Sequence, residues 1–190
     1  MKTTRFITIT LAVLANGVAF SAEPNPAIDY PAFLSEAKAV QSLRESRRVS
    51  EGAFLRMAAE PDTVVLDARS ADRFVMRHVK GAVNLPLPDF SEEALARIIP
   101  SKTTRILIYC NNNFDGDPVA MPSKVASTSL NIYTFNSLYA YGYRNVYELA
   151  PLRDVAQSRL PFEGTRILKS PPFPKATSFE GIDLQKTVAP

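Results

Sequence analysis

The chain has 190 residues, 46% of them hydrophobic and 22% charged, which suffices for one well-buried core and is too short for two. The formal net charge is +3, and the densest basic group, Arg44, Arg47 and Arg48, is interpreted as the solvated end of a helix. Because a nucleic-acid interface needs clustered basic residues on one face, we expect no nucleic-acid partner.

Residues 1–22 are predicted to be a secretory signal peptide. Two basic residues precede an uncharged apolar run at residues 6–20, and small residues follow at Ser21 and Ala22, where cleavage is expected. The run is shorter than the roughly 18 residues that a membrane-spanning helix needs. We therefore expect export to the periplasm, with no stable membrane anchor after cleavage.

Amphipathic helices are predicted on both sides of residue 50. Residues 23–46 form an extension in which apolar side chains recur at helical spacing, and this helix is expected over residues 31–48. Ser50 is placed to cap a second helix over residues 51–60.

The rest of the chain alternates between strand and helix patterns. Buried strands are predicted at residues 63–66, 82–85, 105–109 and 145–149, and helices at residues 91–99 and 130–141, the last ended by Gly142. Strands that alternate with helices predict a parallel sheet with right-handed crossovers.

A long loop, residues 111–129, separates the third strand from the next helix. It holds three asparagines, Gly116 and two prolines, and we expect only a short helix near residues 123–126. Long loops inside compact domains are uncommon and often functional. The last segment, residues 165–190, is rich in proline and is predicted to be irregular.

The only cysteine, Cys110, directly follows the third strand. A single cysteine cannot form an internal disulfide, so the core alone must hold the fold. A leftover thiol in an exported protein is buried and inert, paired with another molecule, or kept for its reactivity. Its place at the carboxyl end of a strand faces the crevice where open α/β sheets bind ligands.

Several segments together resemble the rhodanese-like domain. They are Asp67-Ala68-Arg69, Phe74, His78 to Ala82, Asn84-Leu85-Pro86, the strand ending in Cys110, and Leu138 with Gly142 to Leu149. The resemblance covers residues 47–164. It implies an α/β fold with a small parallel sheet flanked by helices on both faces. It also implies that Cys110 accepts sulfur as a persulfide from a small donor and passes it to a thiophilic acceptor.

The loop after Cys110 departs from the short loop of that family by roughly a dozen extra residues. Asp115 and Asp117 outnumber Lys124 there, so we expect a slightly acidic mouth that repels thiosulfate. The related cell-cycle phosphatases and arsenate reductases also have a longer loop, but they need an arginine where this chain has Gly116. Phosphatase chemistry is therefore the weaker interpretation.

Five loop residues are candidates for substrate binding. The amides of Asn111, Asn112 and Asn113 either donate hydrogen bonds to a bound anion or occupy turns. Phe114 either shields the thiol or anchors the loop. The short loop of the family that this chain resembles carries an arginine or lysine that binds the anionic donor. Lys124 either folds over the cysteine to supply this missing cation or is solvated.

Asp67, Arg69, His78 and Gly81 belong to the motif and are expected to be structural, because buried polar groups of this kind need hydrogen-bond partners. A lone histidine without a second ligand at metal spacing gives no metal site, and we expect neither metal nor cofactor.

Two functions remain open. The first is sulfur binding or transfer through Cys110, with loop amides stabilising the thiolate or persulfide. The second is a catalytically silent module whose loop, residues 111–129, binds a partner protein or a small ligand. A reactive thiol favours the first hypothesis, and a buried thiol behind an ordered loop favours the second.

Overall fold

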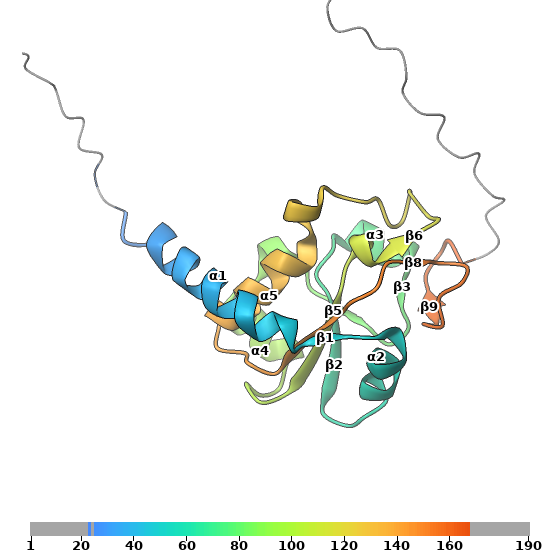
Figure 1. The fold of residues 1–190 in the computed structure, drawn as a ribbon, viewed down its shortest axis with the longest axis horizontal. Helices are drawn as coiled ribbons and strands as arrows, with labels where there is room; N and C mark the ends of the chain where they lie inside the picture. The colour runs from blue at the N-terminus through green and yellow to red at the C-terminus, as the bar shows by residue number, and fades with distance from the viewer. Residues whose placement is uncertain (1–22, 24, 168–190) are drawn as a thin grey trace, which may run out of the picture. The chain divides into compact units, whose positions relative to one another are not determined.

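The computed structural model describes residue 23 and residues 25–167 (Figure 1). The sheet lies within the described residues that follow residue 30. The predicted signal peptide and all but the start of the predicted irregular tail lie outside the described residues, so both stay predictions.

Five parallel strands form the central sheet in the order β1-β7-β5-β2-β4. They are β1 (Arg48–Val49), β2 (Thr63–Asp67), β4 (Val83–Asn84), β5 (Arg105–Tyr109) and β7 (Val146–Leu149). The continuous apolar runs of β2 and β5 suit the centre of a parallel sheet, where both faces are buried. Each predicted strand is present, within one residue at either end.

Helices cover both faces of the sheet (Figure 1). Side chains alternate along β5, so Ile106 and Ile108 point to one face and Leu107 and Tyr109 to the other. The first face packs against α1 (Tyr30–Glu45), α4 (Glu92–Ile98) and α5 (Leu130–Ala140), and the second against α2 (Glu51–Ala58). The predicted fold class is confirmed.

The helix boundaries follow the predicted caps. The hydroxyl of Ser50 accepts a hydrogen bond from the backbone of Ala53, and that of Ser91 accepts one from Ala94. Gly142, with a φ of 86°, ends α5.

Helix α1 is shorter than predicted because Arg48 and Val49 pair with β7 as a strand. Arg44, in its last turn, forms an ion pair with the buried Glu148 of β7. The hydrogen bond to Glu148 raises the pKa of Arg44 above its ordinary value. The interpretation of this arginine as part of a solvated helix end is therefore wrong, since it fastens α1 to the sheet.

Several short elements are absent from the predictions or lie elsewhere than predicted. They are α3 (Ala71–Met76), the 3-10 turns η1 (Leu87–Asp89), η2 (Asn111–Asn113) and η3 (Ala126–Thr128), and two small strand pairs, β3 (His78–Val79) with β9 (Phe162–Glu163) and β6 (Phe114–Asp115) with β8 (Arg153–Asp154). The short helix expected near residues 123–126 lies later, in η3. Within the described residues, no helix combines the length and apolar character needed to cross a bilayer.

Candidate functional site

A buried ion pair lies where β2 and β5 end. Arg69 Nη2 lies 2.5 Å from Asp67 Oδ2, and Arg69 Nε lies 2.9 Å from Asp67 Oδ1. Tyr109, opposite Asp67 in the sheet register, donates from its hydroxyl to Asp67 Oδ2 at 2.5 Å. The other guanidinium N–H groups donate to the carbonyl oxygens of Arg77 and Ala120. All three guanidinium nitrogens of Arg69 are therefore engaged by the protein itself.

This environment keeps Tyr109 protonated. Burial, followed by the charge of Asp67, raises the pKa of Tyr109 well above its ordinary value of about 10. The phenol oxygen also accepts the backbone N–H of Val79 at 3.0 Å. Burial lowers the pKa of Arg69, but the hydrogen bond and charge of Asp67 outweigh burial and raise it.

We expect Tyr109→Phe to remove a pH dependence of stability above pH 10. In the unfolded chain the phenol ionises near pH 10, whereas in the folded protein it stays protonated, so the folded state binds the extra proton. The free energy of unfolding of the wild type should fall more steeply than that of the variant, by about half of 1.4 kcal/mol per pH unit near pH 10 and approaching about 1.4 kcal/mol per pH unit above it. Urea denaturation from about pH 8 to about pH 11, on either side of the ordinary tyrosine pKa, measures how the free energy of unfolding of each protein depends on pH. The same pH dependence in both proteins would contradict the expectation.

Cys110 lies directly after β5 and is only 1% exposed. Its Sγ is 3.5 Å from the hydroxyl of Ser129, the N-cap residue of α5. Its backbone N–H donates to Asn113 Oδ1 at 2.9 Å, and the same oxygen accepts the side-chain N–H of Asn131 at 3.0 Å. Asn113 Nδ2 donates to the carbonyl of Leu149 at 2.7 Å. The thiol is thus held between the starts of η2 and α5, away from solvent.

The two asparagines that follow Cys110 bind the returning part of the loop. Asn111 Nδ2 donates to the carbonyl of Pro122. Asn112 and Lys124 exchange two hydrogen bonds, from Asn112 Nδ2 to the Lys124 carbonyl at 2.8 Å and from the Lys124 backbone N–H to Asn112 Oδ1 at 3.0 Å. These amide groups hold the loop together, as do those of Asn113, which favours the turn-forming role over anion binding.

The first half of the loop is largely buried and the second half is exposed. Phe114 is fully buried and packs edge-on against the rings of Tyr109 and Phe162, with centroid separations of 6.0 and 5.1 Å. Residues 123–128 are all exposed. Phe114 therefore anchors the loop in the core, and the exposed segment is the part with the fewest constraints on its movement.

Asp117 ties the loop to the segment after β9. It is 5% exposed, and its carboxylate accepts a hydrogen bond from Arg77 Nε at 2.9 Å and lies 3.6 Å from Arg166 Nη2. It also accepts the backbone N–H of Ala120. Because two arginines neutralise this charge, Asp117 does not contribute to an acidic mouth, and of the two expected acids only Asp115 is exposed.

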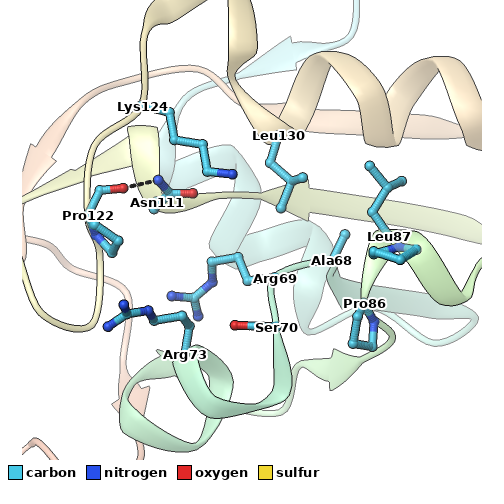
Figure 2. A pocket seen from close by; sticks show the side chains of 11 residues that line it. Ala68, Arg69, Ser70, Arg73, Pro86, Leu87, Asn111, Pro122, Lys124 and Leu130 are labelled. Carbon is cyan, nitrogen blue, oxygen red and sulfur yellow. Dashed lines mark hydrogen bonds between the residues drawn. The ribbon is translucent and has the colours of Figure 1, made fainter.

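A cavity of about 470 Å³ opens beside the loop and the ends of the strands (Figure 2). Its walls come from the segment after β2, from α3, from η1, from the start and the second half of the loop, and from the first residue of α5. The lining residues are Ala68, Arg69, Ser70, Arg73, Pro86, Leu87, Pro88, Asn111, Pro122, Lys124 and Leu130. None of these described residues is acidic.

Arg73 and Lys124 give the cavity its positive charge. The charge of Arg69 is matched by Asp67, whereas in the part of the chain that the structure describes neither Arg73 nor Lys124 has a carboxylate partner. One Arg73 nitrogen donates to the carbonyl of Val119, which leaves its other N–H groups available. An anion in the cavity would therefore meet two cations.

Cys110 does not line the cavity, but its neighbours do. Asn111 follows Cys110 in the chain, Leu130 follows Ser129, and both line the cavity. Both partners of the contact between Cys110 Sγ and the Ser129 hydroxyl are therefore next in the chain to a residue of the cavity wall.

The structure brings some of the predicted site residues together and leaves others apart. Arg69, Asn111 and Lys124 line the cavity, whereas Asn112, Asn113 and Phe114 do not. Sequence reasoning missed Arg73. Its position four residues after Arg69, just beyond a strand end, is the signal that would have placed it at the same edge.

His78 and Gly81 lie outside the cavity lining. The His78 ring stacks on Phe74 at 3.7 Å, its Nδ1 is hydrogen-bonded to the Phe74 carbonyl at 2.7 Å, and its Nε2 is 3.8 Å from Glu163. Gly81, with a φ of 79°, forms the turn between β3 and β4. Among the described residues, no group of three or more His, Cys, Asp or Glu side chains is arranged to hold a metal ion.

Comparison with known proteins gives one matching family. Residues 50–150 match the rhodanese-like domain. A curated relative, thiosulfate sulfurtransferase PspE of Escherichia coli (strain K12), is 35% identical over 46 residues, which is 24% of this chain and 43% of the relative. The match thus spans less than half of that relative's length.

Comparison with solved structures gives one likeness at the level of the fold and one weaker similarity. The BH2092 protein from Bacillus halodurans has 20% sequence identity and a TM-score of 0.50, over 75% of this chain and 95% of that chain. A rhodanese with anions from E. coli has 22% identity and a TM-score of 0.37, over 54% of this chain and 99% of that chain. At these identities the likeness concerns the fold alone.

Proposed function

Because this chain belongs to the rhodanese-like domain family, we propose that it takes up sulfur at Cys110 from a small anionic donor bound in the cavity. One observation carries the proposal. Cys110 and its contact Ser129 are each next in the chain to a residue that lines a cavity with two cations that lack a carboxylate partner among the described residues. The similarity of a short segment to a thiosulfate sulfurtransferase supports the same class of chemistry.

The cavity supplies the anion-binding half of the site. Arg73 and Lys124 attract the negative group of the donor and hold it beside Asn111. An anionic sulfur donor such as thiosulfate then lies on the other side of the wall from Cys110.

The thiol supplies the nucleophile. Once the exposed segment of the loop has moved and water reaches the thiol, Cys110 loses its proton to solvent and the thiolate attacks the outer sulfur of thiosulfate. A new S–S bond forms at Cys110, and the S–S bond of the donor breaks to release sulfite. Ser129 and the amino end of α5 lie beside the sulfur, where a negative charge is favourable. A thiophilic acceptor, either a small thiol or a partner protein, removes the persulfide sulfur.

The donor reaches the thiol when the exposed segment, residues 123–128, moves away from η2. Two hydrogen bonds between Asn112 and Lys124 hold the start of this segment. Each of these hydrogen bonds stabilises the closed position of the segment by about 0.5–1.5 kcal/mol net. Thermal fluctuations of the folded protein can therefore break both bonds and open the segment.

A second function rests on a different observation, the 1% exposure of Cys110. With the thiol closed off, the domain would serve as a binding module that holds an anionic ligand in the cavity without transferring sulfur. In both functions the cavity binds an anion, and they differ in whether Cys110 accepts sulfur from it.

The test is the intact mass of the protein after incubation with thiosulfate or a polysulfide, for the wild type and Cys110→Ser. We expect the wild type alone to gain one sulfur atom, and a thiol reductant to remove it. The absence of any adduct with every donor, together with slow alkylation of the native thiol, would contradict transfer and leave the binding module.

We also propose that this chemistry takes place in the periplasm. The apolar run at residues 6–20 supports export, and sequencing the amino terminus of the mature protein tests it. A first residue at or next to Glu23 is expected, and a mature protein that keeps residues 1–22 would contradict export.

A further inference from the structure

We infer that the cavity selects an organic anion, with a charged head and an apolar body, over an inorganic oxyanion. The inference deepens the proposed function by naming the class of donor, and for the donor's role it rests on that function. Binding of the anion itself does not require sulfur transfer.

The first argument is size. The cavity volume of about 470 Å³ lies within the roughly 300–1,000 Å³ typical of pockets that hold organic ligands. An inorganic oxyanion such as thiosulfate fills a small part of this space and leaves most of the apolar wall in contact with water.

The second argument is the chemistry of the walls. Six of the eleven lining residues, Ala68, Pro86, Leu87, Pro88, Pro122 and Leu130, have apolar side chains. Three of the six are prolines, whose fixed ring geometry loses little conformational freedom when a ligand binds. A wall of this kind gains by covering an apolar body and gains nothing from a bare oxyanion.

The third argument is the separation of charge from apolar surface. In Figure 2 the guanidinium of Arg73 lies on the side of Pro122, the ammonium of Lys124 lies between Asn111 and Leu130, and Pro86 and Leu87 lie on the side away from Pro122. A ligand that satisfies both sides must itself be charged at one end and apolar at the other. Alkyl or aryl compounds with a sulfonate-type head, including organic thiosulfonates, have this form.

Calorimetric titration of the Cys110→Ser protein tests the inference with three probes: benzenesulfonate, thiosulfate and benzyl alcohol. Benzenesulfonate combines the charged head with an apolar ring, thiosulfate has the charge alone, and benzyl alcohol has the ring alone. We expect benzenesulfonate to bind at least tenfold more tightly than either of the others. Equal or tighter binding of thiosulfate or benzyl alcohol, or no binding of benzenesulfonate at millimolar concentration, would overturn the inference.

Variants separate the two halves of the cavity. Lys124→Gln and Arg73→Gln should each weaken benzenesulfonate binding about tenfold, since a hydrogen bond to a charged group is lost. Leu87→Ser should weaken benzenesulfonate binding and leave thiosulfate binding unchanged. Arg97→Gln, on the exposed surface of α4, is the matched control and should change neither. Thermal unfolding of each variant checks that it is folded, and an effect of Arg97→Gln as large as that of Lys124→Gln would contradict a local site.

The design also separates this inference from the proposed function. Benzenesulfonate carries no transferable sulfur, and the Cys110→Ser protein has no thiol, so persulfide chemistry cannot contribute to the result. Selective binding without a sulfur adduct in the wild type would keep the inference and remove transfer. A sulfur adduct without selective binding would do the reverse.

Discussion

Arg69→Met is expected to lower the free energy of unfolding by about 3–5 kcal/mol, the cost of leaving a buried charge without its partner. Asp67 is completely buried and Arg69 is 4% exposed, so solvent cannot replace the lost partner. The variant also removes the donors to the carbonyl oxygens of Arg77 and Ala120. Chemical denaturation at neutral pH measures the change.

A matched variant and a double variant make this expectation specific. Arg97→Met removes an arginine from the exposed pair with Glu93 and should cost less than about 0.5 kcal/mol. Adding Asp67→Asn to Arg69→Met removes the unpaired carboxylate and should recover part of the lost stability. If Arg69→Met cost no more than Arg97→Met, the buried pair would not hold the strand ends together.

Gly164→Ala is expected to lower the free energy of unfolding by about 3 kcal/mol or more. The backbone conformation would strain an alanine by about 1–3 kcal/mol, and the new Cβ would also overlap a backbone oxygen. Gly164 has a φ of 130°, and a Cβ there would lie 2.5 Å from the carbonyl oxygen of Met76. The next two residues donate backbone hydrogen bonds to Val75 and Met76 at 3.0 and 2.9 Å. The substitution therefore loosens the segment after β9 from α3.

The consequence should extend to the loop, because Arg166 of this segment lies beside Asp117. Limited proteolysis should cut Gly164→Ala in residues 111–129 faster than the wild type. Gly81→Ala is the control: its φ is 79°, and a Cβ would meet no atom within 4 Å, so only strain of about 1 kcal/mol remains. Equal stability of the two variants would contradict the overlap at Gly164.

The sheet and its main helices could be predicted because their residues carry local signals. The runs at Val64 to Leu66 and Ile106 to Tyr109 are hydrophobic without interruption, and serines stand at the positions that cap α2 and α4. The same alternation that sends Ile106 and Ile108 toward α5 also places Cys110 beside the start of that helix. Its burial, however, depends on how residues 111–129 fold back over it.

The rest of the site depends on contacts between distant residues, which no local pattern records. The two-residue strands β3, β6, β8 and β9 are too short to show a period, and each exists because a remote strand pairs with it. The asparagines after Cys110 are typical of turns and of anion sites alike, and only the positions of Pro122 and Lys124 decide between the two roles. Arg73 was missed because α3 has six residues, none of them buried, and no apolar stripe that predicts a helix.

If the proposed function is right, the cavity and the buried thiol belong to the same site. The rate at which Cys110 of the wild type gains sulfur from thiosulfate, measured by intact mass with increasing benzenesulfonate, tests this claim most directly. Because Asn111 and Leu130, which follow Cys110 and Ser129 in the chain, line the cavity, we expect benzenesulfonate to compete with the donor, and Lys124→Gln to abolish most of the competition. Persulfide formation at an unchanged rate, with benzenesulfonate bound at saturation, would show that sulfur reaches Cys110 by another route and would contradict the claim.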